Sequence, residues 1–153
     1  MGPVSEAQRA LAVAALGVLA VLVRQAFQAT RAAASPAERL VEEFRLIRFA
    51  SLILAATGGA DVGLAVVQEH LTGTAFQIMV AAAVVALAAV ASMRDPRQAL
   101  TMIALGFVGH ALVDIAHRPG LLPPALAPRW YFVACAVFDS FVAAICYWPA
   151  LRR

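Results

Sequence analysis

Two histidines and an aspartate occur at helical spacing in the stretch GHALVDIAHRPG, residues 109–120, at the end of an apolar run. His110, Asp114 and His117 stand at positions i, i+4 and i+7, which lie within about 60° of one another on a helix. Two imidazoles and a carboxylate on one face are suitable ligands for zinc or iron. The spacing therefore predicts a divalent metal site at His110, Asp114 and His117. Side chains that would complete the coordination are Asp61, Glu69, His70 and Asp139.

A second interpretation of the same residues needs no metal. Asp61, Asp114 and Asp139 are the carboxyl groups inside apolar segments. In a pocket of low dielectric constant, one carboxyl group can stay protonated as a general acid while another, paired with His110, acts as a base. Asp61, His110, Asp114 and Asp139 are thus the candidate catalytic residues for isomerisation, cyclisation or hydrolysis of a lipophilic molecule or lipid.

Three other roles compete with the enzymatic one. Buried acids paired with imidazoles can simply hold a small helical bundle together. The same acids would also suit a transporter or a proton-conducting subunit, although such a protein needs a polar route to the cytoplasm. A structural subunit of a larger membrane complex would present an apolar helix face, expected on the third span, to its partner, and a homodimer is a further alternative.

Composition defines the class of protein in which these residues act. The chain has 153 residues, of which 63% are hydrophobic and 14% charged, and its mean hydropathy is +0.83. These values indicate a membrane protein whose main partner is the lipid bilayer. The net charge of +3 comes without a basic face or an aromatic-basic repeat, so nucleic-acid binding is not expected.

Five apolar segments follow one another along the chain, and each is expected to form a membrane-spanning helix because lipid offers no partner for exposed backbone groups. The predicted fold is a single all-α domain, 1–153, with five transmembrane helices, of which the first has the shortest apolar run. A Ser-Pro start at Ser35 predicts that a helix begins at the inner surface and continues into the second span. The expected spans are 8–27, 47–68, 75–93, 98–117 and 130–151.

Arginine placement orients the bundle. With the N-terminus outside and the C-terminus in the cytoplasm of a multi-pass cell-membrane protein, nine arginines are cytoplasmic and three are outside. Trp130-Tyr131 and Tyr147-Trp148 stand about 26 Å apart along the last span, which matches the two aromatic belts of a bilayer. The histidines and the embedded acids then all lie in the outer half of the membrane.

Polar side chains form one stripe on each of three spans. The second span carries Thr57, Asp61 and Gln68, and the fifth carries Cys135, Asp139 and Cys146. Spans two, four and five are therefore expected to enclose the site, with spans one and three as outer support. Close helix approach is expected at Gly59 and Gly63 and at Gly106 and Gly109. The candidate substrate-binding residues are Thr57, Gln68, Cys135 and Trp130.

Overall fold

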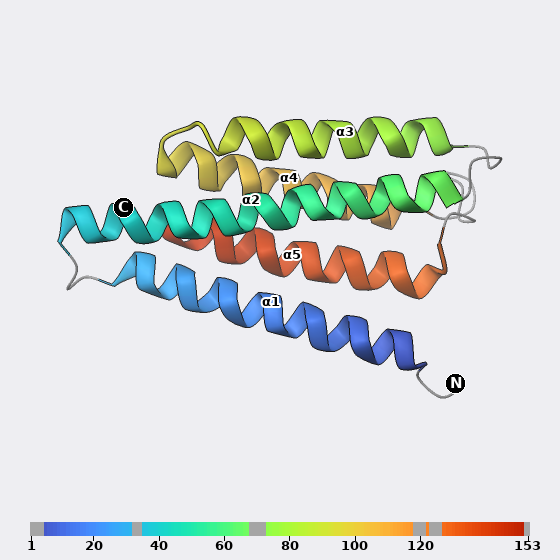
Figure 1. Ribbon diagram of the computed structural model, residues 1–153, viewed down its shortest axis with the longest axis horizontal. Helices are drawn as coiled ribbons and strands as arrows, with labels where there is room; N and C mark the ends of the chain where they lie inside the picture. Colours follow the sequence, from blue (N-terminus) through green and yellow to red (C-terminus); the bar gives the residue numbers. More distant parts are fainter. Residues whose placement is uncertain (1–4, 32–34, 68–72, 118–121, 123–126, 152–153) are drawn as a thin grey trace.

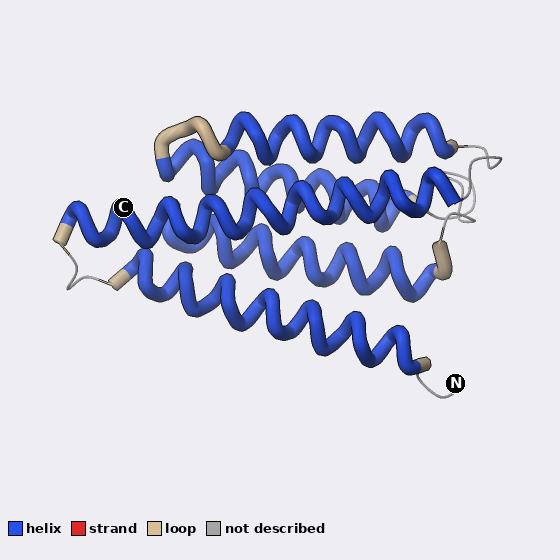
Figure 2. Tube along the Cα trace, in the orientation of Figure 1, coloured by secondary structure: helices blue, strands red, loops and turns tan. Residues whose placement is uncertain are grey.

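The computed structural model describes residues 5–31, 35–67, 73–117, 122 and 127–151, and this part of the chain forms five α-helices (Figures 1 and 2). Consecutive helices run in opposite directions, so the chain starts at one end of the bundle and finishes at the other (Figure 1). The predicted all-α fold is confirmed. The helices are α1 (Glu6–Thr30), α2 (Pro36–Val67), α3 (Thr74–Ala91), α4 (Pro96–Ala116) and α5 (Arg129–Leu151).

Side-chain caps fix where three of the helices begin. Ser5 starts α1 with a capping box, in which its hydroxyl accepts from the backbone N–H of Gln8 and the Gln8 side chain accepts from the Ser5 N–H. Ser35 and Glu38 make the same reciprocal pair at the start of α2. This confirms that a helix begins before the second span. Asp95 caps α4 by accepting from the N–H of Gln98.

All five helices are long and apolar enough to cross a membrane, with mean hydropathies between 1.7 and 2.2 in their most apolar segments. The first, which has the shortest apolar run, forms a helix of 25 residues. Large apolar side chains such as Leu16, Leu52 and Met79 are exposed on the outside of the bundle. A protein with this surface needs lipid around it. The chain is a multi-pass membrane protein.

An apolar core fills the half of the bundle that holds the C-terminus. Side chains from all five helices meet there, and the largest of them are fully buried. They include Leu22, Leu46, Leu54, Leu100, Ile103, Phe107 and Val142. The other half of the bundle is therefore where the polar side chains of the spans can gather.

Helix α1 packs tightly only near its C-terminal end. Its buried residues are Leu22, Ala26 and Ala29, and its N-terminal half diverges from the rest of the bundle (Figure 1). Helix α3 lies on the opposite side of the molecule, against α2 and α4. The expected peripheral position fits both α3 and α1, and α1 also forms part of a cavity wall.

Glycines allow close helix approach at positions that differ from those expected. A Cβ atom at Gly58 would lie 2.9 Å from the carbonyl oxygen of Ala81 on α3, and one at Gly106 would lie 2.7 Å from a methyl group of Leu87. At Gly59, Gly63 and Gly109 a Cβ atom would meet nothing within 4 Å. The prediction is thus confirmed at Gly106 and wrong at the other three glycines, because their faces of the helices do not point at a neighbour.

Candidate functional site

The centre of the polar half is a single imidazole held between two carboxyl groups. The Nδ1 atom of His110 lies 2.7 Å from Oδ2 of Asp139, and its Nε2 atom lies 2.7 Å from Oδ2 of Asp61. The three residues are between 0% and 4% exposed. Three helices meet in this cluster, because Asp61 lies on α2, His110 on α4 and Asp139 on α5. The expected convergence of spans two, four and five is what the structure shows.

His110 connects two helices that scarcely meet. Helices α2 and α5 contact each other sparsely, whereas α4 packs extensively against α5 and also against α2. The imidazole of α4 therefore bridges the gap between the carboxyl groups of its two neighbours. A side chain with two nitrogen atoms on opposite edges of a ring suits this position.

Proton counting limits the charge of this cluster. Each of the two 2.7 Å contacts needs one proton, which either the nitrogen or the carboxyl oxygen donates. An imidazolium can donate both protons, or a neutral imidazole can donate one and a protonated carboxyl group the other. In both arrangements Asp61, His110 and Asp139 together hold two protons and carry a net charge of −1.

Asp114 lies beside this group, one helical turn after His110. Its Oδ2 atom is 3.6 Å from His110 Nδ1, which is too far for a hydrogen bond. The same oxygen is buried and has no hydrogen-bond partner among the described residues, and neither has Oδ1 of Asp139. Two buried carboxyl oxygens next to one imidazole are thus left to accept a proton or a cation.

His117 does not join the cluster, which corrects the ligand set expected from the sequence. Its Nδ1 lies 2.9 Å from the carbonyl oxygen of Val113, and its ring stacks on Phe132 at 4.3 Å. Within the described residues, the group whose ligand atoms lie close enough to hold a metal is His110, Asp114 and Asp139. His117 is the C-cap of α4, where the backbone has left the helix, so helical spacing no longer predicts the direction of its side chain.

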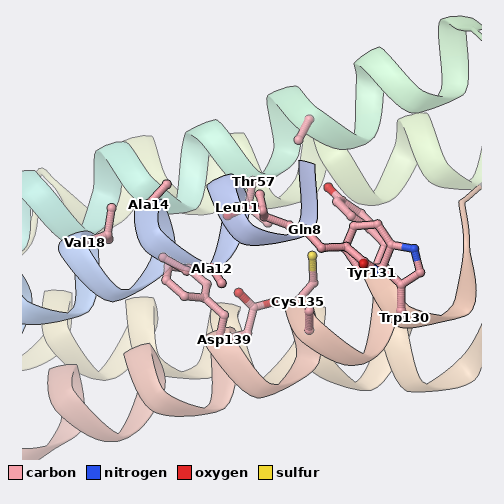
Figure 3. Close-up of a pocket in the computed structure, with 14 residues that line it drawn as sticks. Gln8, Leu11, Ala12, Ala14, Val18, Thr57, Trp130, Tyr131, Cys135 and Asp139 are labelled. Atoms are coloured by element: carbon pink, nitrogen blue, oxygen red, sulfur yellow. The ribbon is translucent and has the colours of Figure 1, made fainter. Parts of the chain in front are cut away.

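A cavity of about 450 Å³ opens beside the cluster, between α1, α2 and α5. Asp139 forms part of its wall, and so do three of the predicted substrate-binding residues, Thr57, Cys135 and Trp130. Figure 3 shows Cys135, Asp139 and the aromatic rings of Trp130 and Tyr131 on α5 facing α1. Most of the remaining wall is apolar and comes from Leu11, Ala12, Ala14, Ala15, Val18, Ala60, Ala134 and Phe138.

The divergence of α1 creates this cavity. Leu22, Ala26 and Ala29 hold the C-terminal part of α1 against the bundle, while its N-terminal half stands away and lines the open space. The α1 residues of the wall were not anticipated, and an apolar helix carries no signal that would single them out. On α5, the helical spacing of Tyr131, Cys135 and Phe138 would have shown that they share a face.

A second cavity, of about 620 Å³, lies between α4 and α5 on the other side of the cluster. Its wall includes Asp114, His117, Arg129 and Ser140. Asp139 of the cluster therefore borders one cavity, and Asp114, beside the cluster, borders the other.

Several predicted residues have another place in the structure. Cys146 is fully buried in the apolar core, away from the polar cluster, and both cysteines are free thiols. The Thr57 hydroxyl donates to the carbonyl oxygen of Ile53 in its own helix. Gln68, Glu69 and His70 lie outside the described residues, as do 118–121 and 123–126 of the proline-rich connection.

Comparison of the chain with protein-family models, with curated proteins and with solved structures gives no match, so the assignment of a function rests on the geometry of this site.

Proposed function

We propose that the protein is an integral-membrane enzyme that performs acid-base chemistry on a lipophilic molecule held between α1, α2 and α5. The observation that carries this proposal is the double position of Asp139. One carboxyl group belongs to the buried imidazole cluster and to the wall of a cavity large enough for a small molecule. The Asp139 side chain is itself fully buried, so proton exchange with a bound molecule would require it to turn toward the cavity.

The roles of three polar residues follow from what each one touches. Asp139 is the catalytic residue, because it borders the cavity and can give a proton to a substrate or take one from it. His110 supplies or accepts the proton that Asp139 exchanges through the 2.7 Å contact. Asp61 is a positioning residue that fixes the imidazole through Nε2. Proton transfer of this kind serves isomerisation, cyclisation or hydrolysis.

The cavity wall indicates the chemical class of the substrate. Most of its side chains are apolar. The few polar ones, which include Gln8, Thr57 and Cys135, are separated by apolar side chains. Much of the N-terminal half of α1 is exposed on the outside of the bundle, where the membrane lies. A hydrophobic molecule or a lipid that enters from the bilayer beside α1 fits these features.

The arrangement favours an enzyme over a proton conductor or a transporter. Leu46, Leu54, Ile103 and Phe107 belong to an apolar core that fills the other half of the bundle. A transport route would have to continue through this tightly packed region, whereas an enzyme needs access from one side only.

We also infer that the polar half faces outward and the apolar core lies toward the cytoplasm. Arg24, Arg31, Arg94 and Arg97 are at the same end of the helices as the core, and arginines gather on the cytoplasmic side of membrane proteins. The N-terminus would then be outside and the C-terminus inside.

The function is tested by replacing the acid without changing its shape. Membranes of cells that produce the wild-type protein or Asp139→Asn are extracted, and their lipophilic small molecules are compared by mass spectrometry. The wild type should consume one species and form another, and Asp139→Asn should abolish this change. Asp95→Asn is the matched control, since Asp95 is exposed and asparagine also caps helices well.

A second pair of variants tests the cavity itself. Ala12→Trp places a large ring in the cavity wall and should reduce turnover, whereas Val13→Trp lies on a side chain that is 70% exposed and outside the wall. Equal turnover in both variants would show that this cavity is not the substrate site. If Asp139→Asn no longer folds, and if the extracts of the wild type and of all variants are identical, the cluster has a purely structural role.

A further inference from the structure

We infer that His110, Asp114 and Asp139 bind one divalent transition-metal ion, with Asp61 holding the imidazole from behind. This inference concerns the same cluster as the proposed function, but it does not depend on any turnover. The ligand set differs from the one expected from the sequence, because Asp139 takes the place of His117.

The geometry supports these three ligands. The Nδ1 atom of His110 lies 2.7 Å from Asp139 Oδ2 and 3.6 Å from Asp114 Oδ2, and the ligand atoms of all three residues lie within 4.8 Å of one another. In a tetrahedral site, metal bonds of about 2.0–2.2 Å place neighbouring ligand atoms about 3.3–3.6 Å apart, so Asp139 would move away from Nδ1 and toward Asp114. A small adjustment of one carboxyl group therefore suffices to bring all three atoms around one ion.

In the part of the chain that the structure describes, two buried carboxyl oxygens lack a hydrogen-bond partner that a bound cation could replace. Asp114 is 4% exposed, yet its Oδ2 has no hydrogen-bond partner among the described residues, and the same holds for Oδ1 of the fully buried Asp139. Leaving a buried carboxyl oxygen unsatisfied is costly, more so in a membrane protein. An ion between Asp114 and Asp139 would satisfy both groups.

Asp61 provides the support that metal-binding histidines usually have. A histidine that ligates a metal through one nitrogen generally donates the N–H of the other to a carboxylate, which fixes the tautomer. His110 Nε2 lies 2.7 Å from Asp61 Oδ2, so a proton on Nε2 leaves the lone pair of Nδ1 free for the ion. Asp61, His110 and the ion would form such a carboxylate-histidine-metal arrangement.

Binding has a defined proton balance. The ion replaces the proton between Nδ1 and Asp139, so the proton exchange between His110 and Asp139 given under the proposed function belongs to the metal-free protein. One imidazole and two carboxylates suit zinc or iron(II), and three protein ligands leave a position for water or substrate. The cavity between α4 and α5, which Asp114 and Ser140 line, offers the ion a path to the site.

The test measures metal content and cobalt(II) binding on detergent-purified protein that carries no polyhistidine tag. Wild-type protein should contain about one zinc or iron per chain by mass spectrometry of the elements. After the metal is removed with a chelator, added cobalt(II) should bind at one site and give visible absorption bands, and acidification should reverse the binding. This titration uses the unmodified chain, so it does not depend on the folding of any variant.

Variants then identify the ligands. His110→Gln, Asp114→Asn and Asp139→Asn should each weaken cobalt binding by more than about 100-fold, and Asp61→Asn by about 10- to 100-fold. His117→Gln is the matched control and should bind as the wild type does. Folded wild-type protein without saturable cobalt binding would overturn the inference. Loss of binding in His117→Gln, with retention in Asp139→Asn, would overturn this ligand set. A protein without metal whose turnover still depends on Asp139 would leave the proposed function intact.

Discussion

At the scale of single residues, His110 is the side chain on which the polar cluster depends. It is the partner of both Asp61 and Asp139, and it lies beside Asp114. Removing one partner from a buried group of charges costs more than the group contributes as a whole, because the remaining charges keep their loss of hydration. His110 should therefore matter more for stability than its neighbour His117.

We expect His110→Ala to lower the free energy of unfolding by about 3–5 kcal/mol, because it leaves Asp61 and Asp139 buried without their hydrogen-bond partner. His117→Ala removes one hydrogen bond to Val113 and a stacked ring contact with Phe132, and should cost about 1–3 kcal/mol. Unfolding in mixed detergent micelles, followed by circular dichroism, measures both. A smaller loss in His110→Ala than in His117→Ala would contradict the picture of a buried, charged cluster.

At the scale of helices, two contacts decide where the site forms. Helix α3 is pressed against α2 at Gly58, while α1 is pressed against the bundle only at Leu22, Ala26 and Ala29. The first contact holds α2 in place one turn before Asp61. The second leaves the N-terminal half of α1 free to line the cavity.

The contact at Gly58 can be tested with two adjacent glycines. Gly58→Ala places a methyl group against the backbone oxygen of Ala81 and a methyl group of Val85, and should destabilise the protein by about 1–3 kcal/mol. Gly59→Ala has open space and should leave the melting temperature unchanged or raise it slightly, because alanine favours helices. Thermal melting of the two purified variants gives the comparison. An equal effect of both would place the helix contact elsewhere.

At the scale of the whole molecule, the imidazole cluster and the apolar core occupy opposite halves of the bundle, although Glu43 and Ser51 are also buried in the half that holds the core. Asp61, His110, Asp114 and Asp139 share one level, and the apolar core occupies the end that holds the C-terminus. A single orientation in the membrane therefore decides on which side any substrate, metal ion or proton reaches the cluster.

Cysteine accessibility tests this orientation in intact cells. In a background with Cys135→Ala and Cys146→Ala, cysteines at Gly73 and Leu122 should react with a membrane-impermeant thiol reagent added outside. Asp95→Cys should react only after the cells are opened, since α3 and α4 are joined at the arginine-rich end. Labelling of Asp95→Cys from outside would reverse the orientation and the assignment of the polar half.

Much of this protein follows from the sequence by itself. Long apolar segments in lipid can only be helices, so the five-helix fold and the Ser35 start of α2 were predictable from composition and capping residues. The high cost of a charge facing lipid likewise predicted that Asp61, His110 and Asp139 would turn toward one another across α2, α4 and α5.

Tertiary structure alone decided the rest, because helical spacing gives a face of a helix but not the neighbour that the face meets. Only packing shows that Gly58 rather than Gly59 touches α3, and that the N-terminal half of α1 opens a cavity beside Asp139. Only packing shows that His117, just beyond the end of α4, contacts Val113 and Phe132. Asp139, rather than His117, therefore lies beside His110 and Asp114 as the third possible metal ligand. Periodicity holds within a helix, whereas crossing angles and helix ends depend on contacts between residues far apart in the sequence.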